Sequence, residues 1–225
     1  MQEKSVIITA GGLGKRMKST LPKQFIVLGN KPLLMHTIQL FYKFDHTIEI
    51  ILALPKDWEN YWQELQVEYN FKIPHTIVLG GAERFHTVQN ALKKCTGKFI
   101  AVHDGVRPFV SRELLELCFD SLKQHSAVIP VLSIKESVRF LSVNKTEALD
   151  RNHYKLVHTP QCFHSEILKN AYLQAFHDLV TDDARLVEQM GEKLFFVESN
   201  EENIKVTTAN DLRIAKAILA SKKQR

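Results

Sequence analysis

The chain alternates between short runs of β-branched and aliphatic residues and longer amphipathic stretches, and this alternation limits the folds it can adopt. The short runs predict strands at residues 5–10, 48–54, 76–79, 98–103 and 127–132. The stretches between them predict helices at 32–44, 55–69, 83–95 and 111–125, with Pro32 and Pro55 in first turns and Ser111 as an N-cap. Strand, helix and strand in this order favour right-handed crossovers. We therefore predict an α/β, Rossmann-like fold with a mostly parallel sheet and helices on both faces.

The alternation breaks after Leu132. Residues 133–157 contain no clear helix, and the run at 138–143 followed by polar residues at 144–147 predicts a protruding β-hairpin. An excursion of 25 residues inside a compact domain is typical of a functional segment, a disordered segment or a partner-binding arm. Helices near 165–177 and 182–190, strands at 194–197 and 204–206, and a helix at 209–220 follow. We expect one domain over residues 1–225, with an arm inserted at 133–157.

Composition excludes several other classes of protein. Of 225 residues, 44% are hydrophobic and 24% are charged, with 9 glycines and 7 prolines, so the chain is neither disordered nor collagen-like. No run approaches the ~20 apolar residues that cross a bilayer, and the N-terminal apolar run is too short for a signal peptide. We therefore expect a cytoplasmic protein with no membrane partner. The cysteines, Cys95, Cys118 and Cys162, lack the spacing of a metal site or a disulfide framework, and we expect them to be reduced and buried.

The net charge of +5 is compatible with binding of nucleic acid, a membrane surface or a small polyanion, and the placement of the cations separates these possibilities. The first predicted strand runs into Thr9-Ala10-Gly11-Gly12-Leu13-Gly14-Lys15-Arg16-Met17-Lys18, and Lys23 follows. Closely spaced glycines let backbone N–H groups face an anion, and the neighbouring cations suit a triphosphate. The loop is not a Walker loop, because Arg16 replaces the metal-binding hydroxyl. It is not a dinucleotide fingerprint either, because Met17 occupies the third glycine position.

A carboxylate follows another predicted strand, in Val102-His103-Asp104-Gly105-Val106-Arg107-Pro108. Ligands of open α/β sheets bind outside the carboxyl ends of the strands, so Asp104 and the glycine loop are expected to face one crevice. A carboxylate beside phosphates suits Mg²⁺, although Asp-Gly is also an ordinary turn.

A third strand end reads Leu79-Gly80-Gly81-Ala82-Glu83-Arg84-Phe85-His86-Thr87. Its glycines could present backbone donors to a nucleotide base, with the Thr87 hydroxyl one turn further on, or they could form only a helix cap. The histidines show neither metal-binding spacing nor a nearby Ser or Cys nucleophile, and we expect most of them to be surface or packing residues.

Taken in order, these segments resemble the 2-C-methyl-D-erythritol 4-phosphate cytidylyltransferase family. The resemblance covers nearly the whole chain and includes Asp150-Arg151, Thr159-Pro160-Gln161, Thr181-Asp182-Asp183-Ala184 and Asn203-Ile204-Lys205-Val206-Thr207. It implies a fold of the nucleotide-diphospho-sugar transferase type. The implied reaction transfers a cytidylyl group from CTP, the co-substrate, to the phosphate of methylerythritol phosphate and releases pyrophosphate.

The resemblance also implies a role for each site residue. The triphosphate would lie against Ala10, Gly11, Gly12 and Gly14, and the charge that develops on it would be stabilised by Arg16 and Lys23. The cytosine and ribose would lie at Gly81, Ala82 and Thr87. Mg²⁺, or another divalent ion, would be held by Asp104. The substrate phosphate would be bound by Arg151 and Lys205, with support from Ser137 and Thr159.

Two further implications concern chemistry and assembly. A phosphate monoester is already ionised at neutral pH, so the implied reaction needs no general base. In the family the arm embraces a second subunit, which implies a homodimer in which Ser137 and Arg151 act across the interface. Ser199 stands where the family often has glycine, and Thr87 where it has serine.

Three alternatives remain at the level of sequence. The Ala-Gly-Gly opening also occurs in the related ribitol-5-phosphate cytidylyltransferases, although residues 150–152 and 202–205 fit the methylerythritol phosphate enzymes better. A nucleic-acid-binding domain would spread its cations along a face or groove, whereas here they cluster beside glycines, so we expect no nucleic-acid partner. A nicotinamide-dependent oxidoreductase is disfavoured by the missing third glycine.

Overall fold

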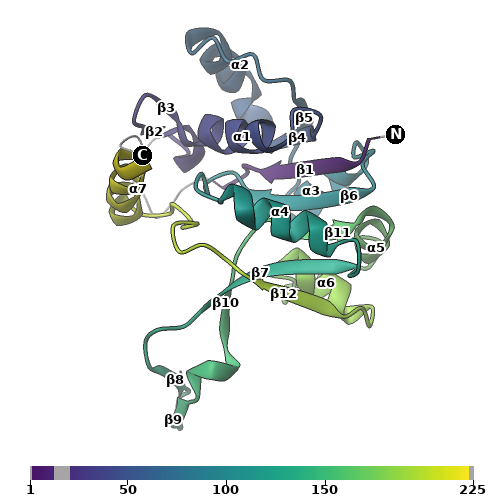
Figure 1. Ribbon diagram of the computed structural model, residues 1–225, viewed down its shortest axis with the longest axis vertical. Helices are drawn as coiled ribbons and strands as arrows, with labels where there is room; N and C mark the ends of the chain where they lie inside the picture. The colour runs from purple at the N-terminus through teal and green to yellow at the C-terminus, as the bar shows by residue number, and fades with distance from the viewer. Residues whose placement is uncertain (1, 13–20, 223–225) are drawn as a thin grey trace.

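The computed structural model describes residues 2–12 and 21–222, and its centre is an eight-stranded sheet (Figure 1). The strands are β1 (Lys4–Thr9), β4 (Glu49–Leu54), β5 (Thr76–Leu79), β6 (Phe99–Asp104), β7 (Ala127–Ser133), β10 (Lys155–Val157), β11 (Gln161–His164) and β12 (Leu194–Glu198). They stand in the order β10-β7-β11-β6-β1-β4-β5, and β12 also pairs with β7. The pairs β1–β4, β1–β6, β4–β5 and β7–β12 are parallel, whereas β11 runs antiparallel to β6 and β7. The predicted Rossmann-like class is confirmed.

Helices cover both faces of the sheet (Figure 1). They are α1 (Leu33–Phe44), α2 (Glu59–Glu68), α3 (Arg84–Leu92), α4 (Arg112–Ser121), α5 (Ser165–Ala171), α6 (Asp183–Gln189) and α7 (Ala209–Lys222). Successive side chains of β1 point to opposite faces, so Val6 and Ile8 pack in a cluster with α1, α2 and α4, while Ile7 packs with α3, α5 and α6. Each large apolar side chain buried in this way contributes about 1.5–3 kcal/mol. The two clusters make the sheet a rigid support for its loops.

Several predicted boundaries were wrong. Pro32 and Pro55 directly precede their helical segments, with ψ angles of 145° and 146°, instead of lying in the first turn. The predicted helix at 55–69 is divided into a 3₁₀ turn, η3 (Lys56–Trp58), and α2, and the helix expected at 165–177 ends at Ala171. Ser111 is an N-cap, as predicted, because its hydroxyl accepts from Leu114 N at 3.1 Å.

Two errors concern strands near the site. The predicted strand at 204–206 is not part of the described sheet, because its backbone contact to the loop after β6 is the single bond from Val206 N to Val106 O at 3.0 Å. Strand β11 was not predicted, since its four residues are too few to show a period. It nevertheless lies between β6 and β7 and places Gln161 opposite Val102.

The arm is the part of the chain that leaves this body (Figure 1). Its strands β8 (Val138–Leu141) and β9 (Thr146–Leu149) form an antiparallel pair, which confirms the predicted hairpin. The two ends of the predicted segment belong to the central sheet, because Ser133 closes β7 and Lys155 begins β10, and the two residues are paired. The base of the arm is therefore anchored, whereas its tip is exposed.

The C-terminal segment packs beside the end of β6. A small hairpin of β2 (Val27–Leu28) and β3 (Lys31–Pro32), which was not predicted, shares a buried cluster with α7. Val206 and Phe109 belong to the same cluster, so residues 203–207 are held next to the loop that follows β6. The three cysteines are buried, as expected. Over the described residues, no helix combines the length and the apolar character that a bilayer crossing requires.

Candidate active site

A cavity of about 580 Å³ opens at the carboxyl ends of β1, β4, β5 and β6. At β1 the order of the strands reverses, because β4 is its neighbour on one side and β6 its neighbour on the other. Open α/β sheets bind their ligands at such points. The predicted site residues that line it are Ala10, Gly11, Gly12, Lys23, Gly81, Ala82, Thr87, Asp104 and Lys205. The structure thus brings the three predicted strand ends into one cavity. Gly14 and Arg16 lie outside the described residues.

Lys23 and the first glycine segment form one corner of the cavity. Lys23 begins the 3₁₀ turn η2 (Lys23–Phe25), and a Cβ on Gly12 would lie 3.2 Å from Lys23 Cε and 3.6 Å from Nζ. The neighbouring Gln24 is buried and donates from Nε2 to Ala10 O at 2.6 Å. Because this bond joins η2 to the end of β1, the ammonium and the glycine backbone share a fixed geometry.

Asp104 is the last residue of β6, and two cations hold its carboxylate. Oδ2 accepts from Arg107 Nε at 3.1 Å and lies 3.1 Å from Lys205 Nζ. Burial alone would raise the pKa of this carboxyl, but the charges of Lys205, Arg84 and Arg107 outweigh that effect and hold the pKa well below its usual range. Asp104 is therefore a permanent negative charge and not a proton acceptor.

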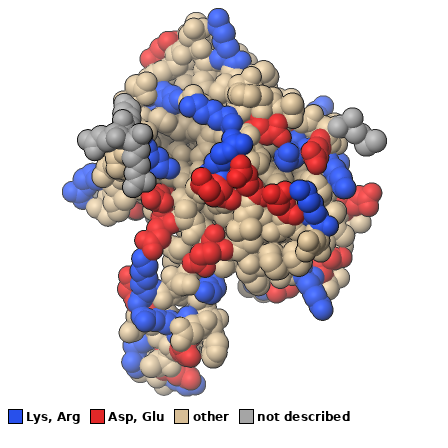
Figure 2. All heavy atoms as spheres, in the orientation of Figure 1, with Lys and Arg blue, Asp and Glu red and all other residues tan. Residues whose placement is uncertain are grey.

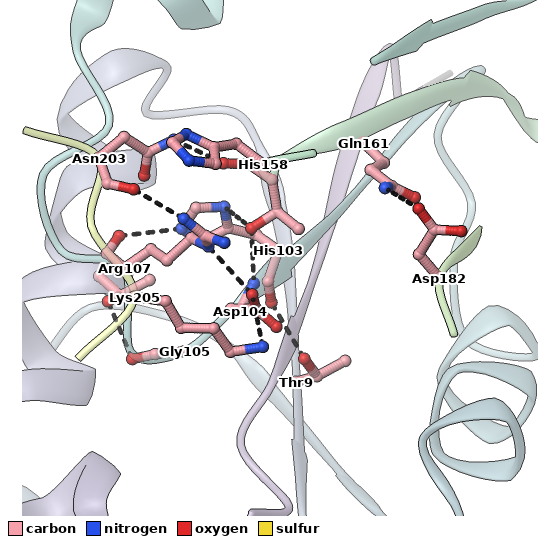
Figure 3. A network of polar contacts seen from close by, with 12 residues as sticks. Thr9, His103, Asp104, Gly105, Arg107, His158, Gln161, Asp182, Asn203 and Lys205 are labelled. Atoms are coloured by element: carbon pink, nitrogen blue, oxygen red, sulfur yellow. Dashed lines mark hydrogen bonds and ion pairs between the residues drawn. The ribbon is translucent and has the colours of Figure 1, made fainter. Parts of the chain in front are cut away.

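A directional chain of hydrogen bonds fixes the backbone of Asp104 (Figure 3). Asp104 N donates to Thr159 Oγ1 at 3.1 Å, Thr159 Oγ1 lies 3.0 Å from His103 Nδ1, and His103 Nε2 lies 3.0 Å from Arg107 O. Since a carbonyl can only accept, Nε2 carries the proton and the Thr159 hydroxyl donates to Nδ1. Burial lowers the pKa of His103 to about 4, so the ring is neutral at pH 7. The hydroxyl of Thr159, a predicted substrate ligand, is engaged within the protein.

A second set of hydrogen bonds connects the segment that carries Lys205 to the hydrogen-bonded residues around Asp104. Arg107 Nη1 donates to Asn203 O at 2.7 Å, and Asn203 Nδ2 donates to Thr159 O at 2.9 Å and to Ser199 Oγ at 3.3 Å. Ser199, at a position where glycine is common in the family, thus supplies an acceptor to the network. Because Lys205 follows Asn203 by two residues, these bonds hold its ammonium near Asp104.

The turn at 80–83 forms the opposite wall. Gly80 N donates to Leu54 O at 2.7 Å, Gly81 N donates to Thr87 Oγ1 at 3.0 Å, and Thr87 Oγ1 donates to Glu83 O at 3.0 Å. A Cβ on Gly81 would lie 2.3 Å from His86 Cβ, so only glycine fits there. The Thr87 hydroxyl therefore maintains the shape of the turn.

Two cations of the cavity were missed by the sequence analysis. Arg84 lines it, and its guanidinium fork donates from Nη1 to Asp183 Oδ1 at 3.0 Å and from Nη2 to Oδ2 at 2.6 Å. Lys56 lines it as well, just after β4. The signal that could have identified both is the one that identified Asp104, namely a charged residue shortly after the carboxyl end of a strand.

Ser137 and Arg151 are not brought to the cavity of their own chain. Ser137 is exposed on the arm. Arg151 lies in the 3₁₀ turn η4 (Arg151–His153), and its Nη1 donates to the carbonyl oxygen of Lys135, another residue of the arm. Neither residue lines the cavity.

Asp104 is the predicted metal ligand, and its surroundings fit one mode of Mg²⁺ binding. The described residues contain no group of three or more His, Cys, Asp or Glu side chains that could hold an ion by themselves. Mg²⁺ is commonly bound by one or two carboxylates together with substrate phosphate oxygens. The ionised carboxylate of Asp104, in a cavity also lined by glycine segments and cations, suits that mode, and not an all-protein metal cage.

Comparison with known proteins agrees with this geometry. A profile of the family described as 2-C-methyl-D-erythritol 4-phosphate cytidylyltransferase matches residues 5–221. The curated protein of that name from Bacteroides fragilis is 48% identical over 217 residues, which cover 96% of this chain and 99% of the relative. The one from Bacteroides thetaiotaomicron is 48% identical over 219 residues, covering 96% and 100%.

Solved structures give the same result. The 4-diphosphocytidyl-2C-methyl-D-erythritol synthase of Anaerococcus prevotii superimposes with a TM-score of 0.82 at 28% identity, covering 97% of this chain and 99% of that chain. The 2-C-methyl-D-erythritol 4-phosphate cytidylyltransferase of Thermus thermophilus gives a TM-score of 0.79 at 27% identity, covering 98% and 100%. The chain therefore belongs to the 2-C-methyl-D-erythritol 4-phosphate cytidylyltransferase family.

Proposed function

We propose that this protein transfers a cytidylyl group from CTP to the phosphate of 2-C-methyl-D-erythritol 4-phosphate, giving 4-diphosphocytidyl-2-C-methyl-D-erythritol and pyrophosphate. The observation that carries the proposal is the cavity in which two glycine segments, Lys23, Lys205 and the ionised Asp104 converge, in a chain of this family. A triphosphate carries about four negative charges, and the cations of the cavity suit it.

The reaction is an in-line displacement at phosphorus. An oxygen of the methylerythritol phosphate attacks the α-phosphorus of CTP, and the bond from that phosphorus to the bridging oxygen breaks. Pyrophosphate leaves with the electron pair. The attacking phosphate is already ionised at neutral pH, so no proton has to be removed. This agrees with an Asp104 whose pKa is held far below its usual range, because the charges of Lys205, Arg84 and Arg107 together outweigh the effect of burial.

Binding and charge stabilisation are assigned to the residues of the cavity. The Gly81–Ala82 backbone beside Thr87 would receive the cytosine and ribose, and the backbone of residues 10–14 would receive the triphosphate. Lys23, together with Arg16, would stabilise the charge that develops on the phosphates. Lys205 would orient the attacking phosphate, because Asn203 and Arg107 fix its segment.

Asp104 would hold Mg²⁺, or another divalent ion, through its carboxylate. When bound, the ion would neutralise charge on the nucleotide phosphates. Thr159 and His103 would serve it indirectly, since they fix the position of the Asp104 backbone.

We further propose that the protein acts as a homodimer joined through the arm, so that Arg151 and Ser137 complete the site of the partner subunit. Support comes from the arm itself, where Val143 is 99% exposed and Leu141 is 73% exposed. Exposed apolar side chains in such number on a hairpin favour burial against another chain.

A substrate panel tests the function. The purified protein would be given CTP, MgCl₂ and either methylerythritol phosphate or ribitol 5-phosphate, and pyrophosphate release would be followed by a coupled assay. We expect release with methylerythritol phosphate, loss of release with EDTA, and at most slow release with ribitol 5-phosphate. Turnover of ribitol 5-phosphate with none of methylerythritol phosphate would overturn the assignment.

A further inference from the structure

The Arg84–Asp183 ion pair joins the cavity wall to α6, a helix packed on one face of the sheet. Arg84 is the first residue of α3, and its side chain is 31% exposed where it lines the cavity. Asp183 is the first residue of α6, and its side chain is fully buried. The carboxylate also accepts from the Tyr172 hydroxyl. A buried carboxylate with this set of donors depends on Arg84 for its charge balance.

The helix α6 is in turn fixed to the central sheet. Gln161 on β11 accepts at Oε1 from Asp183 N at 3.0 Å and from Ala184 N at 2.9 Å. Its Nε2 donates to Asp182 Oδ2 at 2.9 Å (Figure 3). Gln161 is paired in register with Val102, which lies two residues before Asp104 on β6. The position of Asp183 is therefore set by β11, which pairs with the strand that carries Asp104.

On the other side, Arg84 is coupled to the turn at 80–83. The turn and the first turn of α3 are joined by the bonds of Thr87 to Gly81 N and Glu83 O. The close approach of Gly81 to His86 allows little independent movement. A restraint on the guanidinium of Arg84 is consequently a restraint on the whole turn.

We propose that Asp183 is a positioning residue, which acts through Arg84 to hold the turn at 80–83 at the separation from Asp104 that CTP requires. This inference rests on the proposed function, in which CTP spans the cavity from that turn to Asp104. The second substrate is expected to bind beside Lys205 and the partner's arm. Loss of the ion pair should therefore weaken CTP binding selectively.

Two conservative variants test the role. Asp183→Asn keeps the shape of the side chain but removes its charge, while Arg84→Lys keeps the charge but cannot form the two-bond fork. We expect each to raise the Kd of CTP in calorimetry without the second substrate, and the KM for CTP, roughly ten- to hundredfold. The KM for methylerythritol phosphate should stay within about twofold and kcat at saturating CTP within about threefold.

The double variant and a matched control sharpen the test. Because the two residues act as one unit, Arg84→Lys combined with Asp183→Asn should bind CTP no more weakly than the poorer single variant. Arg112→Lys alters an exposed pair with Glu116 at 2.9 Å on α4 and should leave CTP binding unchanged.

Several outcomes would overturn the proposal: unchanged CTP affinity in either folded variant, a fall in kcat with unchanged KM, or an equal rise in both KM values. If Asp183→Asn does not fold, as judged by near-UV circular dichroism, Arg84→Lys decides. A wild-type protein that binds CTP but turns over no methylerythritol phosphate would overturn the proposed function instead, and calorimetry with CTP would still test the role of Asp183.

Discussion

The cavity and the arm belong to one chain but are built in opposite ways. Around Asp104 the polar side chains are buried and bonded to one another, and His103, Thr159 and Asn203 are 0%, 7% and 0% exposed. On the arm, apolar side chains such as Phe140 stand in solvent. Figure 2 shows Lys and Arg side chains, together with some Asp and Glu side chains, on the arm at the bottom of the view. The cavity thus satisfies most of its polar groups within one chain, with Gln24 Oε1 and Asn203 Oδ1 as buried exceptions, whereas the arm leaves apolar surface without cover.

This difference separates the two predicted phosphate ligands. Lys205 is held by its ion pair with Asp104 and by the network around Asn203, so its charge is in place before a ligand arrives. Arg151 is bonded to a backbone oxygen of its own arm, and a two-stranded hairpin alone is only marginally stable. We infer that the half of the site built within each chain, which includes Lys205, is preorganised, and that the other half depends on association.

The largest expected effect tests the preorganised half. Lys23→Ala should lower kcat by about 10²- to 10³-fold, because Lys23 is positioned to stabilise charge on the phosphates in the transition state. The fold should be retained, since the ammonium lines a cavity and not the core. Steady-state kinetics and a thermal melt measure the two effects. Lys94→Ala, on an exposed surface away from the cavity, is the control. Activity within about threefold of wild type would remove Lys23 from the mechanism.

The next effect tests whether the arm completes the site of another chain. Arg151→Ala should lower turnover by about 10²-fold while CTP binding is retained. Mixing this variant with Lys23→Ala should restore activity, because one cavity of each hybrid dimer would combine an intact Lys23 with an intact Arg151. Random reassociation of a twofold dimer predicts recovery of about a quarter of wild-type activity. If the mixture stays as inactive as its parts, Arg151 acts within its own chain or not at all.

The sequence was most informative where a physical period or a short local signal decides the structure. The alternation of apolar runs predicted β1, β4, β5, β6 and β7 and the helices between them, and the run and turn at 138–147 predicted the hairpin. The strand ends also predicted that Asp104 and the first glycine loop would face one crevice, since parallel strands end at one edge, and both line the cavity.

What the sequence could not supply depends on contacts between distant residues. Strand β11 has four residues and no period, and its place between β6 and β7 follows from tertiary packing. The role of Asp183 is invisible for the same reason, because its partner Arg84 is 99 residues away along the chain. Likewise the family resemblance predicts Thr159 as a substrate ligand, and only the fold reveals that its hydroxyl joins Asp104 to His103.

A smaller effect concerns the exposed surface of the arm. Phe140→Asp should weaken the dimer, so that turnover falls by about tenfold on dilution and recovers at high protein concentration. Sedimentation velocity would follow the shift from dimer to monomer. Val67→Asp is the matched control, because Val67 is 82% exposed on α2, away from the arm. A Phe140→Asp variant that remains dimeric and active at all concentrations would show that the arm's apolar side chains do not hold the subunits together.

The smallest effect contrasts His103, a buried histidine next to Asp104, with an exposed histidine of the arm. Burial lowers the pKa of His103, and likewise of His158, to about 4, from an ordinary value of 6.5. Between those values the unfolded chain binds protons that the folded chain does not, so stability should be intact above pH 6.5 and be lost as the pH falls towards 4, by up to about 3 kcal/mol for His103. Urea unfolding at several pH values would measure how the free energy of unfolding depends on pH. His103→Gln should reduce the slope of that dependence by an amount that corresponds to up to one bound proton. His153→Gln, exposed on the arm, is the control. If both variants changed the slope equally, the loss of stability in acid would not arise from the burial of His103 beside Asp104. The buried region around Asp104 and the exposed arm would then not differ in their response to pH.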